Sequence, residues 1–330
     1  MRLAKESFTD LYLGDPSGRV GESPYLWKRD GEVSAVPTEY HAECVGIFNA
    51  ALGQKATAFS ISHSDMQLRG QVVTHTLGTT IVLRRLPRTV PKWADLGMPN
   101  GVIGTMLHGN GALEIPPILT SKRGLILLCG ETDSGKSTTL GVLLREILDA
   151  RPWVATTIED PAELPLAGHH QRGYCYQRSI PIGGFADALR EALRTNPDVI
   201  LLGEIRDADT AITALSAAIT GHLVLSTVHA SDVPQAVRRL AALASRELPQ
   251  TDTADLISSC LHCCIHQRLE KMGVVKPGET GLSNRRLDAT VLFTSKATRT
   301  LIRDLKFERL NDEIAMQRKR LLGNVRLTPV

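Results

Sequence analysis

The sequence predicts an α/β protein in which a domain with a parallel sheet follows a smaller α/β domain. From residue 124 onward, short apolar runs alternate with segments of helical periodicity, as in a parallel sheet with helices on both faces. Residues 1–90 instead contain short strand patterns around one helix. Residues 87–99 are rich in proline and lack periodicity, which is typical of a linker.

These changes of pattern set the expected boundaries. The sequence shows no internal repeat and no low-complexity tract. We expect a small N-terminal α/β domain, a linker with lead-in helices, a parallel-sheet core, and a C-terminal helical part of the same domain, at residues 1–90, 91–121, 122–245 and 246–330 respectively.

The N-terminal domain is predicted to be a small sheet with one helix. Its strand patterns, each short and bounded by turn residues, cover residues 9–13, 25–33, 68–73 and 79–86. The second of these is a hairpin that turns at Asp30 and Gly31. Residues 38–52 are expected to form a helix that Thr38 caps and Gly53 ends.

The second domain alternates strands and helices along the chain. Its predicted strands are the apolar runs at residues 125–129, 154–158, 198–202 and 223–227. A helix after the first strand is indicated by the spacing of Leu140, Leu143, Leu144 and Ile147. Further helices are predicted at residues 185–194, 207–220 and 233–243, and the pattern after Ser245 is mostly helical.

The first strand leads directly into Gly130-x4-Gly135-Lys136-Ser137, the phosphate-loop motif. Successive backbone N–H groups of such a loop form a concave nest for phosphate oxygens, and the next helix directs its positive end there. Lys136 can reach the β- and γ-phosphates, and the Ser137 hydroxyl can ligate Mg2+. Because strand, loop and helix occur in that order, we predict a nucleotide site formed by Gly130, Glu131, Thr132, Asp133, Ser134, Gly135, Lys136, Ser137 and Thr138.

Asp133 is an unusual residue for the middle of this loop, because its carboxylate would face phosphate. Aspartate tolerates a left-handed backbone, so the side chain could point to solvent. Alternatively, the carboxylate weakens phosphate affinity. The sequence leaves both interpretations open.

Carboxylates follow two other predicted strands, at the sheet edge where open parallel sheets bind ligands. Glu159, Asp160 and Glu163 come at the end of the second strand, and Glu204 follows the third. Near a phosphate–Mg2+ centre, such groups orient water or hold the ion's hydration shell. Ordinary loop charges or helix caps are the alternative. We favour Glu204 most, and because no Asp ends its strand, Glu204 and ordered water would serve the metal with Ser137.

Two histidines, His222 and His229, bracket the fourth predicted strand. A lone histidine is more often a hydrogen-bonded structural residue than a catalytic one. Two of them around one strand beside a phosphate site leave a structural and a catalytic role equally open.

Composition excludes several classes of function. The 330 residues carry a formal net charge of only +3, which gives no general case for nucleic acid or an acidic membrane as partner. No apolar run approaches the roughly 18 residues of a membrane span, and the N-terminus lacks the apolar core of a signal peptide. We therefore expect a cytoplasmic protein whose six cysteines stay reduced.

Four sequence blocks resemble the secretion ATPase superfamily, whose members power type II and type IV secretion, type IV pili and conjugation. The blocks match its Walker A, Asp box, Walker B and His box in order, and they are GETDSGKSTT, TTIEDPAEL, NPDVILLGEIRD and GHLVLSTVHASD. They cover most of residues 124–245, and weaker matches lie in residues 1–90. Residues 297–304 resemble the AIRNLIRE motif of the pilus retraction ATPases, which favours that branch together with its conjugation and Dot/Icm-like relatives.

This resemblance implies a RecA-like P-loop NTPase domain preceded by a small PAS-like α/β domain, with six subunits in a ring. By motif position, Lys136 and Ser137 would hold phosphate and Mg2+. Glu163 and Glu204 would be the carboxylates that orient water and complete the metal shell.

The same resemblance assigns roles to four further residues. His222 and His229 would sense the γ-phosphate. Arg69 and Arg84 fall where the family's N-terminal domains place arginines that stabilise transition-state charge. The alternative for each arginine is a solvated charge on a strand face.

The implied activity is ATP hydrolysis with Mg2+ by a homo-hexameric motor that couples turnover to domain rotation. The motor would be cytoplasmic and peripheral to the inner membrane through a pilus or secretion platform, with no obligatory nucleic acid and no small-molecule substrate other than ATP. Two alternatives stay open. The family usually has glycine where this chain has Asp133, so the chain could be a nucleotide-bound structural ring component with weak hydrolysis. It could also be a nucleic-acid-stimulated ring NTPase.

A dense group of cysteines and histidines lies at residues 260–266. On a helix, Cys260, Cys263 and Cys264 would share one face, which predicts core packing. A zinc site needs a closed tetrahedral shell, and the spacing does not favour one.

Overall fold

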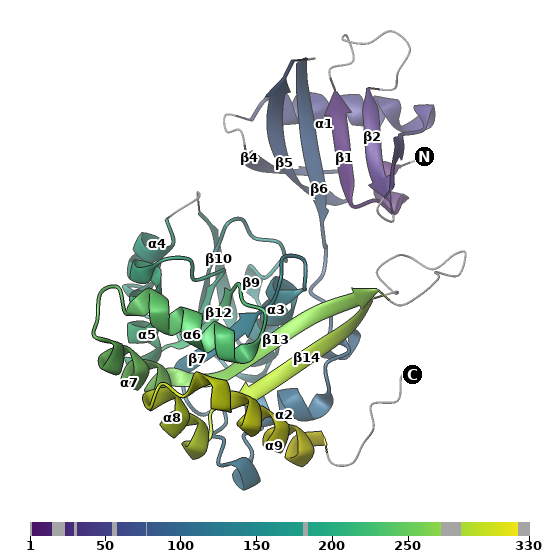
Figure 1. Ribbon diagram of the computed structural model, residues 1–330. Helices are drawn as coiled ribbons and strands as arrows, with labels where there is room; N and C mark the ends of the chain where they lie inside the picture. Colours follow the sequence, from purple (N-terminus) through teal and green to yellow (C-terminus); the bar gives the residue numbers. More distant parts are fainter. Residues whose placement is uncertain are drawn as a thin grey trace. The chain divides into compact units, whose positions relative to one another are not determined.

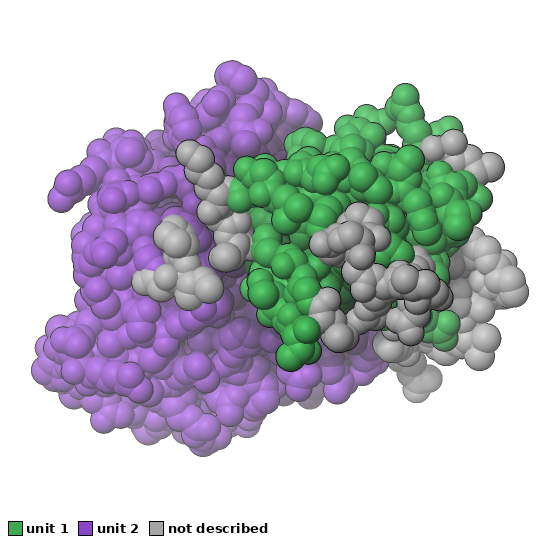
Figure 2. Space-filling view, turned by 90° about the horizontal axis from the view of Figure 1, so that it is seen from above, with its two compact units in different colours: residues 1–89, 272–285 green, residues 90–271, 286–330 purple. Residues whose placement is uncertain are grey.

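The computed structural model describes residues 2–14, 24–29, 32–54, 58–76, 78–180, 184–271 and 285–322. The chain divides into two compact units, which Figure 2 colours separately. Unit 1 comprises residues 1–89 and 272–285, and unit 2 comprises residues 90–271 and 286–330. The turn predicted at Asp30 and Gly31 lies outside the described residues.

Unit 1 is built on a six-stranded sheet in the order β3-β2-β1-β6-β5-β4, in which all adjacent strands run antiparallel (Figure 1). The strands are β1 (Asp10–Gly14), β2 (Tyr25–Arg29), β3 (Glu32–Ala35), β4 (Ala58–His63), β5 (Met66–His75) and β6 (Gly78–Leu86). The predicted strands and the predicted hairpin pairing of β2 with β3 are confirmed, and β4 is an additional strand that the sequence pattern did not indicate.

Helix α1 (His41–Leu52) covers one face of this sheet (Figure 1). Its Ile47 is fully buried and belongs to one apolar cluster with Leu11 of β1 and Leu83 of β6. Strand residues next to these leucines in sequence point to the other face, because side chains alternate along a strand. The core of unit 1 therefore lies between α1 and a single face of the sheet.

The predicted end of this helix is confirmed and its predicted cap is wrong. Gly53 follows the last turn of α1, as expected. At the other end, a 3-10 turn, η2 (Thr38–Tyr40), precedes the helix, so Thr38 is part of the turn and not the cap. Tyr40 occupies the cap position without a side-chain hydrogen bond.

Unit 2 is built on an eight-stranded sheet in the order β14-β13-β7-β12-β11-β8-β10-β9. The strands from β13 to β10 in this order run parallel, and β9 is antiparallel to its neighbour β10. The strands are β7 (Gly124–Cys129), β8 (Val154–Glu159), β9 (Gly168–His169), β10 (Tyr174–Ser179), β11 (Val199–Leu202), β12 (Leu223–Val228), β13 (Leu261–Lys271) and β14 (Arg285–Phe293).

Helices cover both faces of this sheet, as the alternating pattern predicted. One apolar cluster takes residues from α4 (Phe185–Leu193), α5 (Ala208–Ile219), α6 (Val233–Ala244), α7 (Gln250–Cys260), α8 (Lys296–Arg303) and the start of α9 (Leu310–Leu322). The opposite cluster takes residues from α2 (Asn100–His108) and α3 (Lys136–Ala150). Short 3-10 turns complete the chain at η1 (Leu3–Lys5), η3 (Trp93–Leu96), η4 (Gly111–Leu113) and η6 (Phe307–Arg309).

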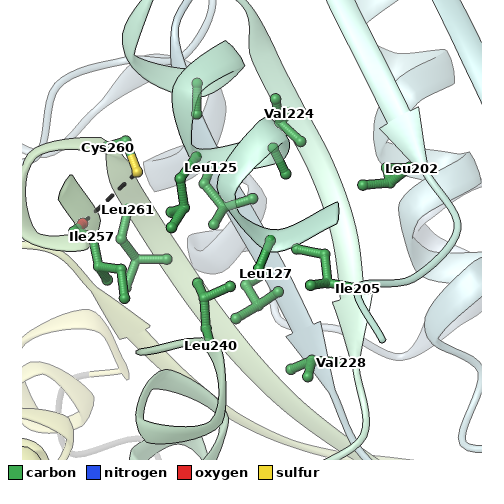
Figure 3. Packing of buried hydrophobic residues seen from close by; sticks show 14 of the residues in the cluster. Leu125, Leu127, Leu202, Ile205, Val224, Val228, Leu240, Ile257, Cys260 and Leu261 are labelled. Atoms are coloured by element: carbon green, nitrogen blue, oxygen red, sulfur yellow. Dashed lines mark hydrogen bonds between the residues drawn. The ribbon is translucent and has the colours of Figure 1, made fainter. Parts of the chain in front are cut away.

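Central strand β7 contributes to both clusters. Leu125 and Leu127 point to the first, where Figure 3 shows them close to Leu240 of α6 and Ile257 of α7. Ile126, between them in sequence, belongs to the opposite cluster. This strand is buried along its whole length, so the loop that follows it starts from a fixed position.

The expectation of a mostly helical segment after Ser245 is only partly correct. Strands β13 and β14 extend the sheet there. Both segments mix polar and apolar residues, and their periodicity did not distinguish strand from helix. Cys260 ends α7, whereas Cys263 and Cys264 lie on β13 and face opposite clusters. The prediction that the three cysteines share one helix face is therefore wrong, but all three thiols are buried, as core packing requires.

No helix in the described part of the chain is long and apolar enough to cross a membrane.

Candidate nucleotide site

The polarity of the strands gathers most of the predicted site residues at one edge of the sheet. Because β7, β8, β11 and β12 are parallel, their carboxyl ends meet at the same edge. The phosphate loop follows β7 there, Glu159 ends β8, Glu204 comes just after β11, and His229 comes directly after β12. This is the carboxyl edge, the usual ligand edge of an open parallel sheet.

The phosphate loop runs from Gly130 to Gly135, between β7 and α3. Gly130 and Gly135 have φ angles of +146° and +84°, which a residue with a side chain rarely adopts. Asp133 also has a positive φ, of +61°, and its side chain is exposed. The expected left-handed backbone at Asp133 is therefore confirmed.

Lys136 is the buried cation of the loop. Its side chain is only 8% exposed, and Nζ donates hydrogen bonds to the carbonyl oxygens of Gly130 (3.0 Å) and Glu131 (2.5 Å). Burial lowers the pKa of Lys136, whereas the nearby carboxylates of Glu204 and Asp133 act to raise it. A buried ammonium whose hydrogen-bond partners are all neutral is suited to an anionic ligand, so the loop fits a nucleotide phosphate.

The other predicted loop residues differ in exposure. Glu131, Thr132 and Ser137 are exposed, and Ser134 is buried. Ser137 and Thr138 lie on the first turn of α3, where backbone N–H groups have no partner within the helix. An exposed hydroxyl at this helix start is placed to meet a ligand from solvent, which fits the predicted metal-binding role of Ser137.

Glu204 is held firmly beside the loop. The backbone carbonyl oxygen of Thr227 on β12 accepts a hydrogen bond from Ile205 N (2.9 Å), and the Thr227 hydroxyl donates to Gly203 O (2.7 Å). The Glu204 carboxylate between these anchors is 16% exposed and forms an ion pair with Arg206. Hydrogen bonding to Glu204 raises the pKa of Arg206.

His229 reaches the same carboxylate. Its Nε2 lies 3.6 Å from Glu204 Oε2, which is a close polar contact but not a hydrogen bond. The imidazole is 47% exposed, so it stays accessible to a ligand at the carboxyl edge. The structure thus brings Lys136, Glu204 and His229 together, as predicted.

The acidic loop after β8 is organised by Gln177 of β10. Its Nε2 donates to Glu159 Oε1 (2.9 Å) and to Leu164 O (2.8 Å), while its Oε1 accepts from Leu166 N (3.1 Å). Burial raises the pKa of Glu159, and the charge of Glu163 adds to this effect. Glu159 is therefore the buried carboxylate of this loop, and Glu163 is exposed on its surface.

His222 is not part of this site. It precedes β12, and its carbonyl oxygen accepts from Gly124 N (3.2 Å) at the start of β7. That is the amino edge of the sheet, and six residues of strand separate His222 from His229. The predicted shared role of the two histidines is wrong for this arrangement, because a strand holds its two ends about 20 Å apart.

Arg69 and Arg84 lie in unit 1. They are paired in register across β5 and β6, next to the core residues Leu68 and Leu83, so both point to the face away from the core. Arg84 Nε donates to Asp10 Oδ1 at 3.1 Å. Their role at a nucleotide stays a prediction.

Two residues of the carboxyl edge were missed by the sequence analysis. Arg206 could have been suspected from its position two residues after Glu204. Gln267 lies on β13, and its Nε2 donates to Ser134 O in the phosphate loop (2.7 Å). Gln267 lies between His266 and Arg268, so its sequence neighbours do not signal burial, and a buried amide's partners cannot be located from sequence.

A comparison with known proteins assigns the family. The family described as Type II/IV secretion system protein matches residues 49–302. This chain belongs to that family. It is 38% identical over 248 residues to the uncharacterized protein YggR of Escherichia coli (strain K12), covering 72% of this chain and 69% of that protein.

Two relatives have names that describe activities or processes. The type IV pilus retraction ATPase PilT of Pseudomonas aeruginosa is 30% identical over 328 residues, covering 94% of this chain and 86% of PilT. A twitching motility protein of Neisseria gonorrhoeae is 33% identical over 240 residues, covering 71% of this chain and 57% of that protein. The chain is thus a member of the type IV pilus and secretion ATPase family.

Solved structures agree with the fold. The pilus retraction motor PilT with bound ADP superposes with a TM-score of 0.74 at 29% identity, covering 94% of this chain and 86% of that one. The ATPase DotB of Legionella pneumophila has a TM-score of 0.68 at 21% identity, which shows similarity of fold only. The predicted class, a RecA-like P-loop NTPase domain with a parallel sheet after a small PAS-like α/β domain, is confirmed.

Proposed function

We propose that this chain is the ATP-hydrolysing motor of a type IV pilus, conjugation or type IV secretion machine. It would work as a homo-hexamer and couple ATP turnover to rotation between its N-terminal domain and its ATPase domain. Its partner would be the cytoplasmic face of an inner-membrane platform, with no obligatory nucleic acid and no small-molecule substrate other than ATP. The named relatives and the AIRNLIRE-like residues 297–304 on α8 and just after it support this branch.

The observation that carries the proposal is the pairing of a buried cation with a restrained carboxylate. Lys136 is buried among neutral oxygens at the start of α3, and Glu204 is close enough to influence its pKa. Among the described residues the cation has no hydrogen bond to a carboxylate, so it can bind phosphate, while the Glu204 carboxylate is held by its ion pair with Arg206.

These residues divide the work of hydrolysis between them. Lys136 would hold the β- and γ-phosphates, and Ser137 would hold Mg2+, with Glu204 acting on it through ordered water. When bound, Mg2+ neutralises charge on the transferred phosphoryl group. Glu204 would orient the attacking water, His229 would sense the γ-phosphate, and Glu163 would add a second carboxylate from the loop after β8.

Two arginines of unit 1 complete the proposal. Arg69 and Arg84 lie side by side on one sheet face, and a pair of guanidinium groups is suited to charge that develops on a transferred phosphate. Their substitution should lower kcat more than nucleotide affinity, if this role is correct.

The test is Mg2+-dependent phosphate release by the purified protein, with the oligomer mass measured in the same samples. Glu204→Gln should bind ATP normally and release phosphate at least about a hundredfold more slowly, as expected for loss of a water-orienting carboxylate. Glu308→Gln is the matched control. Glu308 is also paired with an arginine, since its Oε1 lies 2.9 Å from Arg238 Nη1, but its side chain is exposed and lies outside the candidate site. Undiminished hydrolysis by Glu204→Gln would contradict the assigned role.

A second candidate function is favoured by Asp133. Its carboxylate stands in the phosphate loop and acts on Lys136 electrostatically, so it competes with phosphate for the same cation. The chain would then be a nucleotide-bound structural ring component with weak hydrolysis. If the wild type binds ATP without steady release and only Asp133→Gly turns over, this second function is correct.

A further inference from the structure

Gln267 on β13 contacts the phosphate loop through its side-chain amide and its backbone. Its side chain is 1% exposed, and its Nε2 donates to Ser134 O at 2.7 Å. The backbone of Gln267 also lies against the loop, since a Cβ atom added at Gly130 would come within 2.3 Å of Gln267 O. A Cβ atom at Gly135 would lie 3.1 Å from Gln267 Nε2. One residue therefore contacts the beginning and the end of the phosphate loop.

The bond to Ser134 fixes the orientation of the peptide that follows it. In a trans peptide, the C=O group and the next N–H group point in opposite directions. Ser134 O is turned toward Gln267, so the N–H of Gly135 points away from β13. Gly135 precedes α3 directly, and its N–H is one of those that a phosphate nest uses.

We propose that Gln267 is a positioning residue for phosphate binding, because its amide holds Ser134 O so that the Gly135 N–H faces the phosphates. The inference rests on the proposed binding of nucleotide at this loop. Gln267 itself would not touch the nucleotide, since its side chain is only 1% exposed and its amide binds the loop carbonyl. Without this bond, the Ser134–Gly135 peptide can rotate and turn a carbonyl oxygen toward the phosphates.

A second buried glutamine in unit 2 provides a matched control. Gln317 on α9 is 0% exposed, and both ends of its amide bind the backbone of Phe293 at the end of β14. Its Nε2 donates to Phe293 O and its Oε1 accepts from Phe293 N, both at 2.8 Å. Gln267 Oε1, in contrast, has no hydrogen-bond partner among the described residues.

This difference separates an effect on binding from an effect on stability. Methionine has a size similar to glutamine and makes no strong hydrogen bond. Gln267→Met removes one hydrogen bond and one unpaired buried acceptor, so its stability should change little. Gln317→Met removes the partner of the buried Phe293 N–H, so its unfolding temperature should fall further, although Phe293 O keeps its hydrogen bonds from Ser295 N and the Thr298 hydroxyl.

The experiment measures affinity for a fluorescent ATP analogue with Mg2+, together with unfolding temperature without nucleotide, for the wild type and both variants. We expect Gln267→Met to bind at least tenfold more weakly, with KM for ATP raised by a similar factor and kcat changed less. Gln317→Met should melt at a lower temperature than Gln267→Met and bind within twofold of the wild type.

The outcomes distinguish the inference from the function on which it rests. If the wild type binds the ATP analogue and Gln267→Met binds it with the same affinity, the positioning role alone is overturned. An equal loss of affinity in Gln317→Met would also overturn it, because the effect would then follow general stability. A wild type that does not bind nucleotide would overturn the proposed function and the inference together.

Discussion

The two edges of the eight-stranded sheet contain similar residues that are partnered differently. At the amino edge, Lys122 Nζ donates to Asp198 Oδ1 at 2.6 Å, and Asp198 Oδ2 accepts from Val154 N. At the carboxyl edge, Lys136 donates only to neutral oxygens of its own loop and is more deeply buried. Lys122 therefore forms an ion pair, whereas Lys136 forms none with the described residues, and the carboxylates of Glu204 and Asp133 act on it only at longer range.

This difference shows which edge is prepared for a ligand. A buried charge without a partner is costly, so a protein that keeps one gains stability when an anion binds. An exposed ion pair has no such need and contributes little. Incomplete charge compensation therefore identifies the carboxyl edge more clearly than the mere presence of lysine, histidine or carboxylate, which both edges contain.

The largest expected effect comes from replacing each of the two lysines by alanine, one at a time. Lys136→Ala should lower kcat/KM for ATP at least about a hundredfold, because charge-assisted hydrogen bonds to phosphate are worth about 1.5–3 kcal/mol each. Lys122→Ala should leave kcat/KM within twofold of the wild type and lower the free energy of unfolding by at most about 1 kcal/mol. Phosphate release and urea unfolding check both; equal losses of activity would remove the contrast between the edges.

The two histidines around β12 should differ by a smaller factor. His229→Ala should lower kcat about tenfold, because the imidazole 3.6 Å from Glu204 would no longer act at the carboxyl edge. His222→Ala, at the other end of the same strand, should keep kcat within twofold. Steady-state kinetics of the two variants tests this; a similar loss in His222→Ala would mean that the amino edge takes part in turnover.

The amino edge should instead make stability depend on pH. Burial, together with a smaller effect of the nearby charge of Arg299, lowers the pKa of His262, at the start of β13, from 6.5 to about 4. The unfolded chain binds the proton more readily, so this contribution is complete above pH 6.5 and is lost as pH falls toward 4. At pH 5 the loss should be about 2 kcal/mol.

Urea unfolding at pH 7.5 and pH 5 measures this loss. His262→Leu should reduce the difference in unfolding free energy between the two pH values by that amount, with nucleotide binding at the carboxyl edge unchanged. If the variant and the wild type lose the same stability between these pH values, His262 is not the residue responsible.

Much of the site could be predicted because its information is local. The phosphate loop needs only a strand, a glycine-rich turn and a helix in sequence, and the structure has all three from Gly124 to Ala150. Glu204 and His229 were predicted for a similar reason, since each follows a buried strand directly. Parallel strands then bring these separate ends to one edge.

What depends on long-range register could not be predicted. Gln267 meets Ser134 because β13 pairs with β7, a pairing between segments more than a hundred residues apart. His222 is different, because strand polarity alone places it opposite to His229, and attention to the direction of β12 would have excluded it. Strand β9 was missed because its two residues are too few to show a period, whereas β4 and β10 have six residues each and were overlooked.

The most direct test of this account is hydrogen exchange of the wild-type protein with and without ADP and Mg2+. Backbone amides that bind phosphate exchange more slowly when the ligand is present. We predict slower exchange in peptides that cover residues 130–138 and 203–206, with no change in peptides that cover residues 120–124 and 220–223. Slower exchange in the peptides of residues 120–124 and 220–223, with no change in those of residues 130–138 and 203–206, would contradict the assignment of the nucleotide to the carboxyl edge.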